Sequence, residues 1–266
     1  MIKVVVVGAG GRMGRVVSRA VWQAEDMVLA GAVDVRGEGQ DVGLLWGGSE
    51  VGITLQRDLE EVLHRVAPHV MVDFTTPDAV ADNVKKALRN GVRAVVGTTG
   101  MSGAELEEIR ALAEKQRVGC VVAPNFALGA VLLIRFAAEA AKFFPHVEII
   151  ELHHDQKLDA PSGTALKTAE VVAAARGDFR QGLPAEVEKI PGARGACFDG
   201  GIRLHSVRLP GLVAHQEVIF GGLGQTLTIR HDSLSRESFV PGVLLAIRRV
   251  MELEGLVYGL DKLVFE

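Results

Sequence analysis

The segment with the most reactive side chains runs from residue 151 to residue 165 and reads Glu-Leu-His-His-Asp-Gln-Lys-Leu-Asp-Ala-Pro-Ser-Gly-Thr-Ala. An apolar run precedes a group of basic side chains, namely His153, His154 and Lys157. A helical pattern then begins at Ser162, Gly163 and Thr164. N–H groups at a helix start, with the Thr164 hydroxyl, form a site for a carboxylate. A lysine and a histidine add positive charge and a transferable proton, so the segment predicts anion binding coupled to proton transfer.

The segment allows two other interpretations, a metal site and a solvated loop. His153 and His154 would point to opposite faces of a strand, and neither a cysteine nor a His-x-x-x-His spacing completes a metal-binding set. The two cysteines, Cys120 and Cys197, lie far apart, which excludes a zinc ribbon or a disulfide framework and is typical of a reducing compartment. We therefore expect no metal. A solvated polar loop is the plainer alternative, but such loops rarely end in an anion cradle.

A glycine-rich turn lies near the start of the chain and consists of Gly8, Ala9, Gly10, Gly11, Arg12, Met13 and Gly14. It follows a β-branched run and precedes a helical pattern, where a dinucleotide-binding fingerprint must lie. The spacing G-x-G-x-x-G from Gly8 would place its last glycine at Met13, whereas G-x-x-G-x-x-G uses Gly8, Gly11 and Gly14. A structural turn is the alternative, but the context favours a site for the phosphates of a dinucleotide.

Asp34 lies at the end of the second strand-like run, 20 residues after Gly14. A carboxylate there is placed to bind the adenosine ribose hydroxyls and would repel a 2′-phosphate, which favours NAD over NADP. Arg12 and Arg36 lie nearby and could pair with that phosphate instead. We therefore expect the cofactor to be NADH or NADPH, with the preference left open.

Small and hydroxyl-bearing residues follow three further strand-like runs. They are Phe74-Thr75-Thr76-Pro77, Gly97-Thr98-Thr99-Gly100 and Ala123-Pro124-Asn125-Phe126. Ligands of open α/β sheets bind beyond the carboxyl ends of strands, so these segments are expected to contact the nicotinamide side of the cofactor. Each of them taken alone would be ordinary turn chemistry.

The elements around these residues predict two domains. Strand-like runs at 2–7, 27–33, 70–74, 92–96 and 118–122 alternate with helical patterns at 13–21, 77–90 and 102–115, which predicts an α/β, Rossmann-like doubly wound parallel sheet. After residue 126 come helices at 127–144 and 162–175 and strands at 147–152, 202–208, 215–220 and 225–231, with a long loop at 176–201. Neighbouring strands without intervening helices predict an α+β domain with a mixed sheet. A final helix is expected at 241–252.

Composition narrows the classes of partner. Hydrophobic residues make up 48% and charged residues 23%, which excludes wholesale disorder. The net charge of −4 disfavours nucleic acid or an anionic membrane as the main partner. The longest apolar stretch, 127–141, is interrupted by Arg135 and Glu139, so no membrane span is expected. With no signal peptide recognised, we expect a cytoplasmic protein.

The segment 151–165 resembles the signature of the bacterial lysine-pathway family of 4-hydroxy-tetrahydrodipicolinate (dihydrodipicolinate) reductases. The resemblance extends over nearly the whole chain. It includes the glycine turn, Gly97–Gly100, Ala123–Phe126, Arg208-Leu209-Pro210-Gly211 and Ser235-Arg236. It implies an NAD(P)H-dependent reduction of 4-hydroxy-tetrahydrodipicolinate to tetrahydrodipicolinate in the diaminopimelate route, acting on a small cyclic dicarboxylate.

The resemblance also implies domains and residue roles. Residues 1–126 would bind the dinucleotide, 239–266 would return to that domain, and 127–238 would bind substrate and form a homotetramer. His153 matches the proton donor or acceptor and Lys157 the proposed proton donor, while His154, Ser162, Gly163 and Thr164 match the substrate site. The cofactor contacts would be Gly8, Ala9, Gly10, Gly11, Arg12, Met13, Asp34, Gly97, Thr98, Thr99, Ala123, Pro124, Asn125 and Phe126. Thr76 replaces an arginine that some members carry, which loosens any strict preference for NADPH.

Since cofactor and substrate would bind to separate domains, we expect closure about hinges near Phe126 and Phe239. The sequence also allows two other functions: a different nicotinamide enzyme on this scaffold, such as an amino-acid dehydrogenase, and a catalytically silent nucleotide sensor. The pair His153 and Lys157 argues against a sensor, which needs no proton donor.

Overall fold

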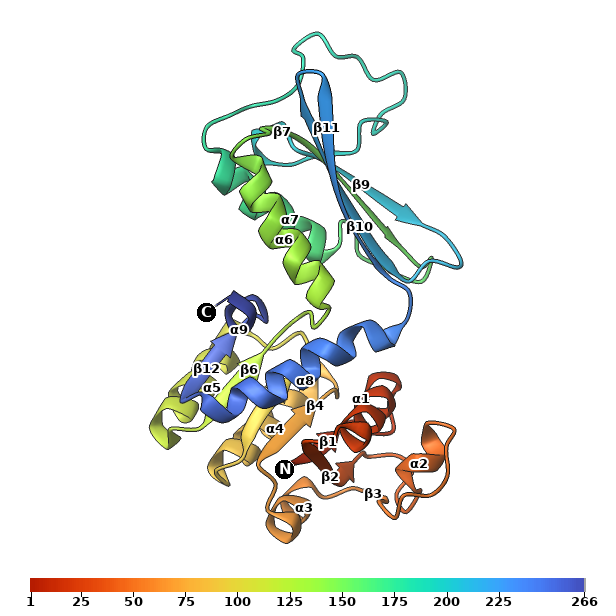
Figure 1. The fold of residues 1–266 in the computed structure, drawn as a ribbon, viewed down its shortest axis with the longest axis vertical. Coiled ribbons are helices and arrows are strands. Elements are labelled where there is room, and N and C mark those ends of the chain that lie inside the picture. Colours follow the sequence, from red (N-terminus) through yellow and green to blue (C-terminus); the bar gives the residue numbers. More distant parts are fainter. Residues whose placement is uncertain (266) are drawn as a thin grey trace. The chain divides into compact units, whose positions relative to one another are not determined.

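The computed structural model describes residues 1–265, and the chain divides into two compact units (Figure 1). Unit 1 comprises Met1–Phe126 together with residues 236–265, and unit 2 comprises Ala127–Ser235. Each unit has its own sheet and its own buried core, so each is described by itself.

Unit 1 is built on a seven-stranded sheet whose strand pairs are all parallel. Its strands are β1 (Ile2–Val7), β2 (Met27–Val33), β3 (Leu55–Gln56), β4 (Val70–Asp73), β5 (Arg93–Val96), β6 (Gly119–Val122) and β12 (Gly255–Tyr258). They lie side by side in the order β12-β6-β5-β4-β1-β2-β3. The order reverses at β1, and a ligand of a doubly wound sheet binds at such a reversal. The predicted Rossmann-like sheet is confirmed.

The helices of unit 1 cover both faces of this sheet, as a doubly wound fold requires. They are α1 (Arg12–Gln23), α2 (Val42–Leu45), α3 (Leu59–Val66), α4 (Pro77–Arg89), α5 (Gly103–Gln116), α8 (Val240–Arg249) and α9 (Asp261–Phe265). Apolar side chains of α3, α4 and α5, among them Val62, Val84 and Ile109, share one core with β1, β4 and β5. On the other face, α1 packs against α8.

Local sequence determines several of these helix ends. Ser102 and Glu105 form the predicted capping box of α5, in which the Ser102 Oγ accepts from the Glu105 N–H and the Glu105 carboxylate accepts from the Ser102 N–H. Pro77 occupies the first turn of α4, as predicted. The last predicted helix ends earlier than expected, at Arg249, and a 3-10 turn continues it to Glu252.

Unit 2 is a mixed five-stranded sheet with two helices. Its strands are β7 (His146–His153), β8 (Ala196–Cys197), β9 (Arg203–Arg208), β10 (Ala214–Gly222) and β11 (Gln225–Ser233), in the order β11-β10-β7-β9-β8. The central pair β7–β9 is parallel and the other pairs are antiparallel, so the predicted mixed sheet is confirmed. Helices α6 (Leu128–Ala141) and α7 (Gly163–Arg176) pack on it, with Leu133, Ile149 and Val172 in the shared core.

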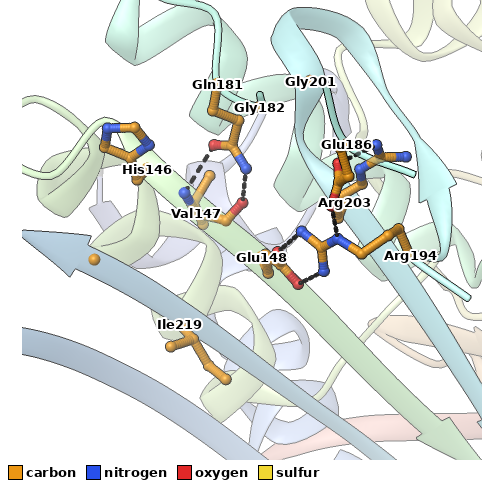
Figure 2. Close-up of a pocket in the computed structure, with 11 residues that line it drawn as sticks. His146, Val147, Glu148, Gln181, Gly182, Glu186, Arg194, Gly201, Arg203 and Ile219 are labelled. Carbon is orange, nitrogen blue, oxygen red and sulfur yellow. Dashed lines mark hydrogen bonds and ion pairs between the residues drawn. The ribbon is translucent and has the colours of Figure 1, made fainter. Parts of the chain in front are cut away.

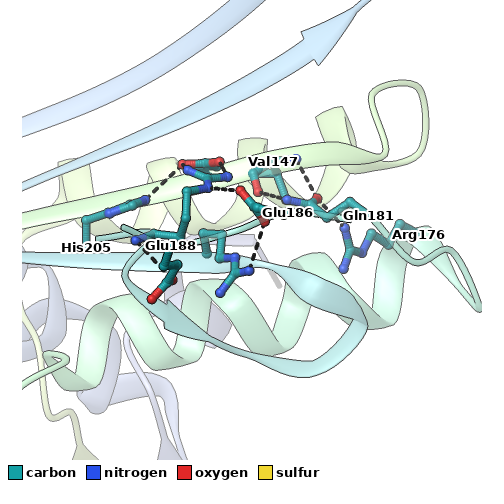
Figure 3. A network of polar contacts seen from close by, with 9 residues as sticks. Val147, Arg176, Gln181, Glu186, Glu188 and His205 are labelled. Atoms are coloured by element: carbon teal, nitrogen blue, oxygen red, sulfur yellow. Dashed lines mark hydrogen bonds and ion pairs between the residues drawn. The ribbon is translucent and has the colours of Figure 1, made fainter. Parts of the chain in front are cut away.

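The loop predicted at 176–201 is irregular over 177–195, but polar contacts attach it to the sheet (Figures 2 and 3). The Gln181 side chain bonds both backbone groups of Val147, with its Oε1 accepting at 2.9 Å and its Nε2 donating at 2.8 Å. Arg194 donates to Glu148 of β7 and to Glu186 of the loop. These residues border a cavity of about 360 Å³. Two short elements, β8 and a 3-10 turn at Asp199–Gly201, replace the end of the predicted loop.

Candidate active site

The glycine turn of unit 1 packs so closely against its neighbours that side chains at two of its glycines would clash. Gly8 has a φ of +78°, and a Cβ there would lie 2.4 Å from the Phe74 carbonyl oxygen. A Cβ on Gly14 would lie 2.0 Å from the Gly8 carbonyl oxygen. These glycines therefore let β1, the turn and α1 approach one another closely, as the fingerprint requires.

The start of α1 provides hydrogen-bond donors for an anion. Gly11 is the N-cap residue and has no side chain that could cap the helix. The first N–H groups of a helix have no partner within the helix, and the helix dipole adds a partial positive charge there. Arg12 and Met13 begin this helix beside the reversal of strand order at β1. The arrangement fits a pyrophosphate.

Asp34 joins this turn to the end of β2. Its carboxylate accepts hydrogen bonds from the Gly10 N–H at 2.9 Å and from the Arg36 N–H at 3.0 Å. Arg15 Nε donates to the Gly10 carbonyl at 2.8 Å, so both backbone groups of Gly10 are held. Asp34 and Arg36 border a cavity of about 880 Å³ that also reaches Lys86. The cavity is large enough for a nucleotide, and Asp34 retains acceptor capacity for ribose hydroxyls.

The predicted contacts at the ends of β4 and β5 are organised by Asp73, which sequence reasoning missed. This buried carboxylate accepts from the Thr98 hydroxyl at 2.8 Å, the Thr75 hydroxyl at 2.7 Å and the Asn83 amide at 2.9 Å. The strand Val-Met-Val-Asp carried a signal, because a carboxylate that ends a fully apolar strand must find donors.

The remaining predicted cofactor residues differ in exposure. Thr98, Ala123 and Phe126 are buried, whereas Thr99 and Pro124 are exposed. The Phe126 ring packs against the Phe74 ring with centroids 6.0 Å apart. A Cβ on Gly97 would lie 2.1 Å from the Phe74 ring, so this glycine is required by packing. Backbone groups and the exposed side chains, rather than the buried ones, are available to a ligand here.

In unit 2, His153 ends strand β7 beside a buried ion pair. The Glu151 carboxylate bonds His153 Nδ1 and accepts two bonds from the Arg208 guanidinium, at 2.7 and 2.9 Å. Burial alone would raise the pKa of Glu151, but hydrogen bonds from His153, Arg208 and Ser206 lower it to about 2. Glu151 is therefore ionised in the folded protein.

Lys157 lies four residues beyond His153 in the loop that leads to α7. Its Nζ donates to the Asp159 carboxylate at 2.6 Å, and this contact lowers the pKa of Asp159. Arg208 Nη2 donates to the Asp159 carbonyl at 2.9 Å. His154 is exposed. Arg208 therefore contacts both the loop that carries Lys157 and the end of the strand that carries His153.

The predicted anion cradle lies at the start of α7. Ser162 Oγ accepts from the Ala165 N–H at 3.2 Å, so this hydroxyl caps the helix as predicted. Gly163 is exposed, and a Cβ there would meet no atom within 4 Å. Behind the cradle, the Gln216 amide donates to the Thr168 hydroxyl, which donates to the Thr164 carbonyl at 2.8 Å. This buried chain attaches the helix start to β10.

The sequence reasoning assigned no role in this site to Glu151, Arg208 or Gln216. Alternation along β7 could have found Glu151, since it lies on the same face as the buried Val147 and Ile149. A carboxylate on the covered face of a strand needs a cation. The partners Arg208 and Gln216 come from β9 and β10, and only the strand pairing brings them next to β7.

Within residues 1–265, no three His, Cys, Asp or Glu side chains lie close enough together to hold a metal ion. Burial raises the pKa of the Cys120 thiol to about 12, so this cysteine is a poor ligand. No helix in the same part of the chain has the length and apolar character of a membrane span.

Comparisons with known proteins agree over the whole chain. Residues 2–126 match the family model "Dihydrodipicolinate reductase, N-terminus", and residues 129–264 match "Dihydrodipicolinate reductase, C-terminus". The 4-hydroxy-tetrahydrodipicolinate reductase of Desulfitobacterium hafniense is 57% identical over 98% of this chain and 97% of its own length. That of Moorella thermoacetica is 56% identical over 99% and 98%, respectively.

Solved structures include a similar dihydrodipicolinate reductase and more distant enzymes of the same fold. A dipicolinate-bound dihydrodipicolinate reductase from Paenisporosarcina sp. TG-14 has a TM-score of 0.88 and 47% identity, covering 98% of this chain and 99% of that chain. An amine dehydrogenase from Mycobacterium smegmatis, at 16% identity and a TM-score of 0.67, covers 98% and 95% and shares the fold alone. The two family models together span nearly every residue, and the chain therefore belongs to the dihydrodipicolinate reductase family.

Proposed function

We propose that this chain reduces 4-hydroxy-tetrahydrodipicolinate to tetrahydrodipicolinate, with NADH or NADPH as the hydride donor, in the diaminopimelate route of lysine biosynthesis. The observation that carries the proposal is that Arg208 contacts both Glu151, the partner of His153, and the carbonyl of Asp159, the partner of Lys157. The open helix start at Gly163 follows in the same segment. Relatives named as 4-hydroxy-tetrahydrodipicolinate reductases are 57% and 56% identical over 97% and 98% of their length, which supports the proposal.

The substrate would be a small cyclic dicarboxylate. The dipicolinate bound to the Paenisporosarcina enzyme is a ring with two carboxylates and supports this class. One carboxylate would accept from the first N–H groups of α7 and from the Thr164 hydroxyl. Charge from Lys157 and a hydrogen bond from His154 would hold the ring on the other side. Ser162 acts indirectly, because its hydroxyl caps the helix.

Proton transfer is the chemical task of this chain's own residues. For tetrahydrodipicolinate to form, the 4-hydroxyl of the substrate must leave as water, which gives a ring carbon conjugated with an imine. NADH or NADPH, when bound, would supply the hydride to that carbon. Negative charge then develops on the ring nitrogen and the neighbouring carbon of the substrate. Lys157 or His153 donates the proton that neutralises this charge. Both side chains are held by carboxylates, Lys157 by Asp159 and His153 by Glu151.

Unit 1 would bind the cofactor. The phosphates would lie on the turn from Gly8 to Met13, the adenosine ribose on Asp34, and the nicotinamide side against residues 97–99 and 123–126. A side chain at Gly8 or Gly14 would clash with neighbouring backbone atoms. That these positions are glycine, which keeps the turn tight beside the start of α1, supports this assignment. One cavity is lined by the acidic Asp34 and by the basic Arg36 and Lys86. This combination of charges supports the use of both NADH and NADPH.

We also propose domain closure about hinges near Phe126 and Phe239, and a homotetramer formed through unit 2. Closure would bring the nicotinamide to the substrate. Small-angle scattering with and without both ligands tests closure, since identical profiles contradict it. Sedimentation velocity gives the number of subunits, and a monomer at enzyme concentrations used for assays would contradict the tetramer.

The decisive experiment is a spectrophotometric assay of NAD(P)H oxidation, with the substrate generated in situ and each cofactor tried in turn. We expect oxidation that depends on this substrate. Cofactor binding without oxidation would indicate a sensor instead. Faster oxidation with an open-chain imine or keto acid would indicate a different dehydrogenase.

A further inference from the structure

Glu151 is a buried carboxylate that has no role of its own in the proposed proton transfer. It is 1% exposed and lies in the middle of the sheet, opposite Ser206 of β9 and Gln216 of β10. A buried charge is costly unless partners satisfy it. Glu151 has such partners in the two-pronged contact with Arg208 and the contact with His153 Nδ1. Its position in the sheet is thus tied to one of the two candidate proton donors.

The contact between Glu151 and His153 determines where the imidazole carries its proton. An ionised carboxylate can only accept hydrogen bonds, so His153 must donate from Nδ1. In the neutral ring Nε2 then carries the lone pair, and in the charged ring Nε2 carries the transferable proton. Either way, Nε2 is the atom left for the substrate.

A second path leads from Glu151 to Lys157. Arg208 is held by both oxygens of Glu151, and its Nη2 also donates to the Asp159 carbonyl at 2.9 Å. The Asp159 carboxylate in turn accepts from Lys157 Nζ at 2.6 Å. The loop that carries the lysine is therefore attached to the same carboxylate that holds the histidine.

We propose that Glu151 is a positioning residue of this enzyme, whose carboxylate keeps His153 in the Nδ1–H form and, through Arg208, holds the loop that carries Lys157. The inference rests on the proposed function. It assigns Glu151 and Arg208 to the support of proton transfer rather than to contact with the reacting atoms.

The same strand contains a matched control. Glu148, three residues earlier on β7, also pairs with one arginine and one histidine: Arg194, and His205 through Nε2 at 2.8 Å (Figures 2 and 3). These partners belong to the loop at 177–195 and to β9, not to the segment 153–164. Glu148→Gln removes an ion pair with the same types of partner without touching the proposed site, from a carboxylate that is 34% exposed where Glu151 is 1% exposed.

The first test compares Glu151→Gln with Glu148→Gln in steady-state kinetics. We expect Glu151→Gln to lower kcat by about 10²-fold, a loss typical of disturbed general acid–base catalysis, with KM for NADH within twofold of wild type. Glu148→Gln should keep both values within twofold. A kcat within twofold of wild type in Glu151→Gln, or an equal loss in both variants, would overturn the proposal.

A second measurement needs neither a variant of Glu151 nor turnover. Solid-state ¹⁵N spectra of histidine-labelled wild-type enzyme at about pH 8, where an ordinary histidine is neutral, report which ring nitrogen carries the proton. The signals of His153 are those absent from His153→Gln. We expect a protonated Nδ1, and a protonated Nε2 with a bare Nδ1 would overturn the proposal. Because this spectrum is recorded without substrate, it stands apart from the assay that decides the proposed function.

Discussion

The carboxylate of Asp34 accepts a hydrogen bond from the backbone N–H of Gly10, 24 residues earlier in the chain, at 2.9 Å. The acidic end of β2 and the glycine turn after β1 are therefore one structural unit. The residue proposed to bind ribose therefore also fixes the turn proposed to bind phosphate, so changes at Asp34 should affect more than the ribose contact.

Asp34→Asn should change both cofactor affinity and cofactor preference. Hydrogen bonds to a charged group contribute about 1.5–3 kcal/mol, so KM for NADH should rise at least about tenfold. KM for NADPH should rise less, because the repulsion of the 2′-phosphate is removed. The measurement is steady-state kinetics with both cofactors. Asp58→Asn, which caps α3 beside the same cavity, is the control, and an equal rise for both cofactors contradicts the ribose assignment.

Lys157→Ala should lower kcat by about 10²- to 10⁴-fold while NADH still binds, since a positioned proton donor contributes that much. The checks are stopped-flow turnover and a fluorescence titration with NADH. Lys167→Ala is the control, because this lysine is exposed on α7 and pairs with Glu170. Near-normal turnover without Lys157 would remove it from the mechanism.

Gly163→Ala should weaken substrate binding without destabilising the fold. A Cβ at Gly163 meets no protein atom within 4 Å, so it would project into the space proposed for the carboxylate. We expect KM for the substrate to rise about tenfold, the loss of one good hydrogen bond, and Tm to stay the same or rise. Gly103→Ala is the matched control, since Gly103 also follows a capping serine and also has open space. Equal KM values in both variants would contradict the cradle.

Glu151 should make the stability of unit 2 depend on acid pH. Its pKa falls from 4.5 to about 2 on folding, because donors to the carboxylate outweigh burial. A lowered pKa stabilises the fold above the unfolded value, by about 3 kcal/mol here. This contribution should be lost as the pH falls from 4.5 to about 2.

Calorimetry of wild type and Glu151→Gln checks that dependence. The difference in Tm should be largest at neutral pH and should narrow through the range from pH 4.5 to about 2. The exposed Glu170→Gln serves as the control for a carboxylate outside the buried pair. A difference in Tm for Glu151→Gln that is independent of pH would mean that the charge of Glu151 does not stabilise the fold.

Local patterns predicted the elements that carry the site. The β-branched run Ile2–Val7, the capping box at Ser102 and the cap at Ser162 each require only neighbouring residues, and each occurs as predicted. The missed elements have weaker local patterns. Strand β3 has two residues and α3 has eight, and both lie between polar turns. Strand β12, Gly255–Tyr258, is held by pairing with β6 rather than by a pattern of its own.

The polar supports of the site were harder to predict than the site itself. Asp73 and Glu151 each end or interrupt an apolar strand, so their burial was visible in the sequence. Their partners were not, because Thr98 and Arg208 lie 25 and 57 residues away and reach them only through strand pairing. Spacing along a chain indicates which side chains share a face, while the choice between neighbouring strands depends on the register of the whole sheet.

The late position of β12 has a consequence for synthesis on the ribosome. Residues 127–235, which form all of unit 2, emerge before the strand that pairs with β6 exists. Until Gly255–Tyr258 have been translated, the nascent Rossmann sheet has a bare edge at β6, and bare edges invite pairing with other chains. If translation stalled after residue 235 and before Gly255, the nascent chain would contain all of unit 2 but an incomplete unit 1.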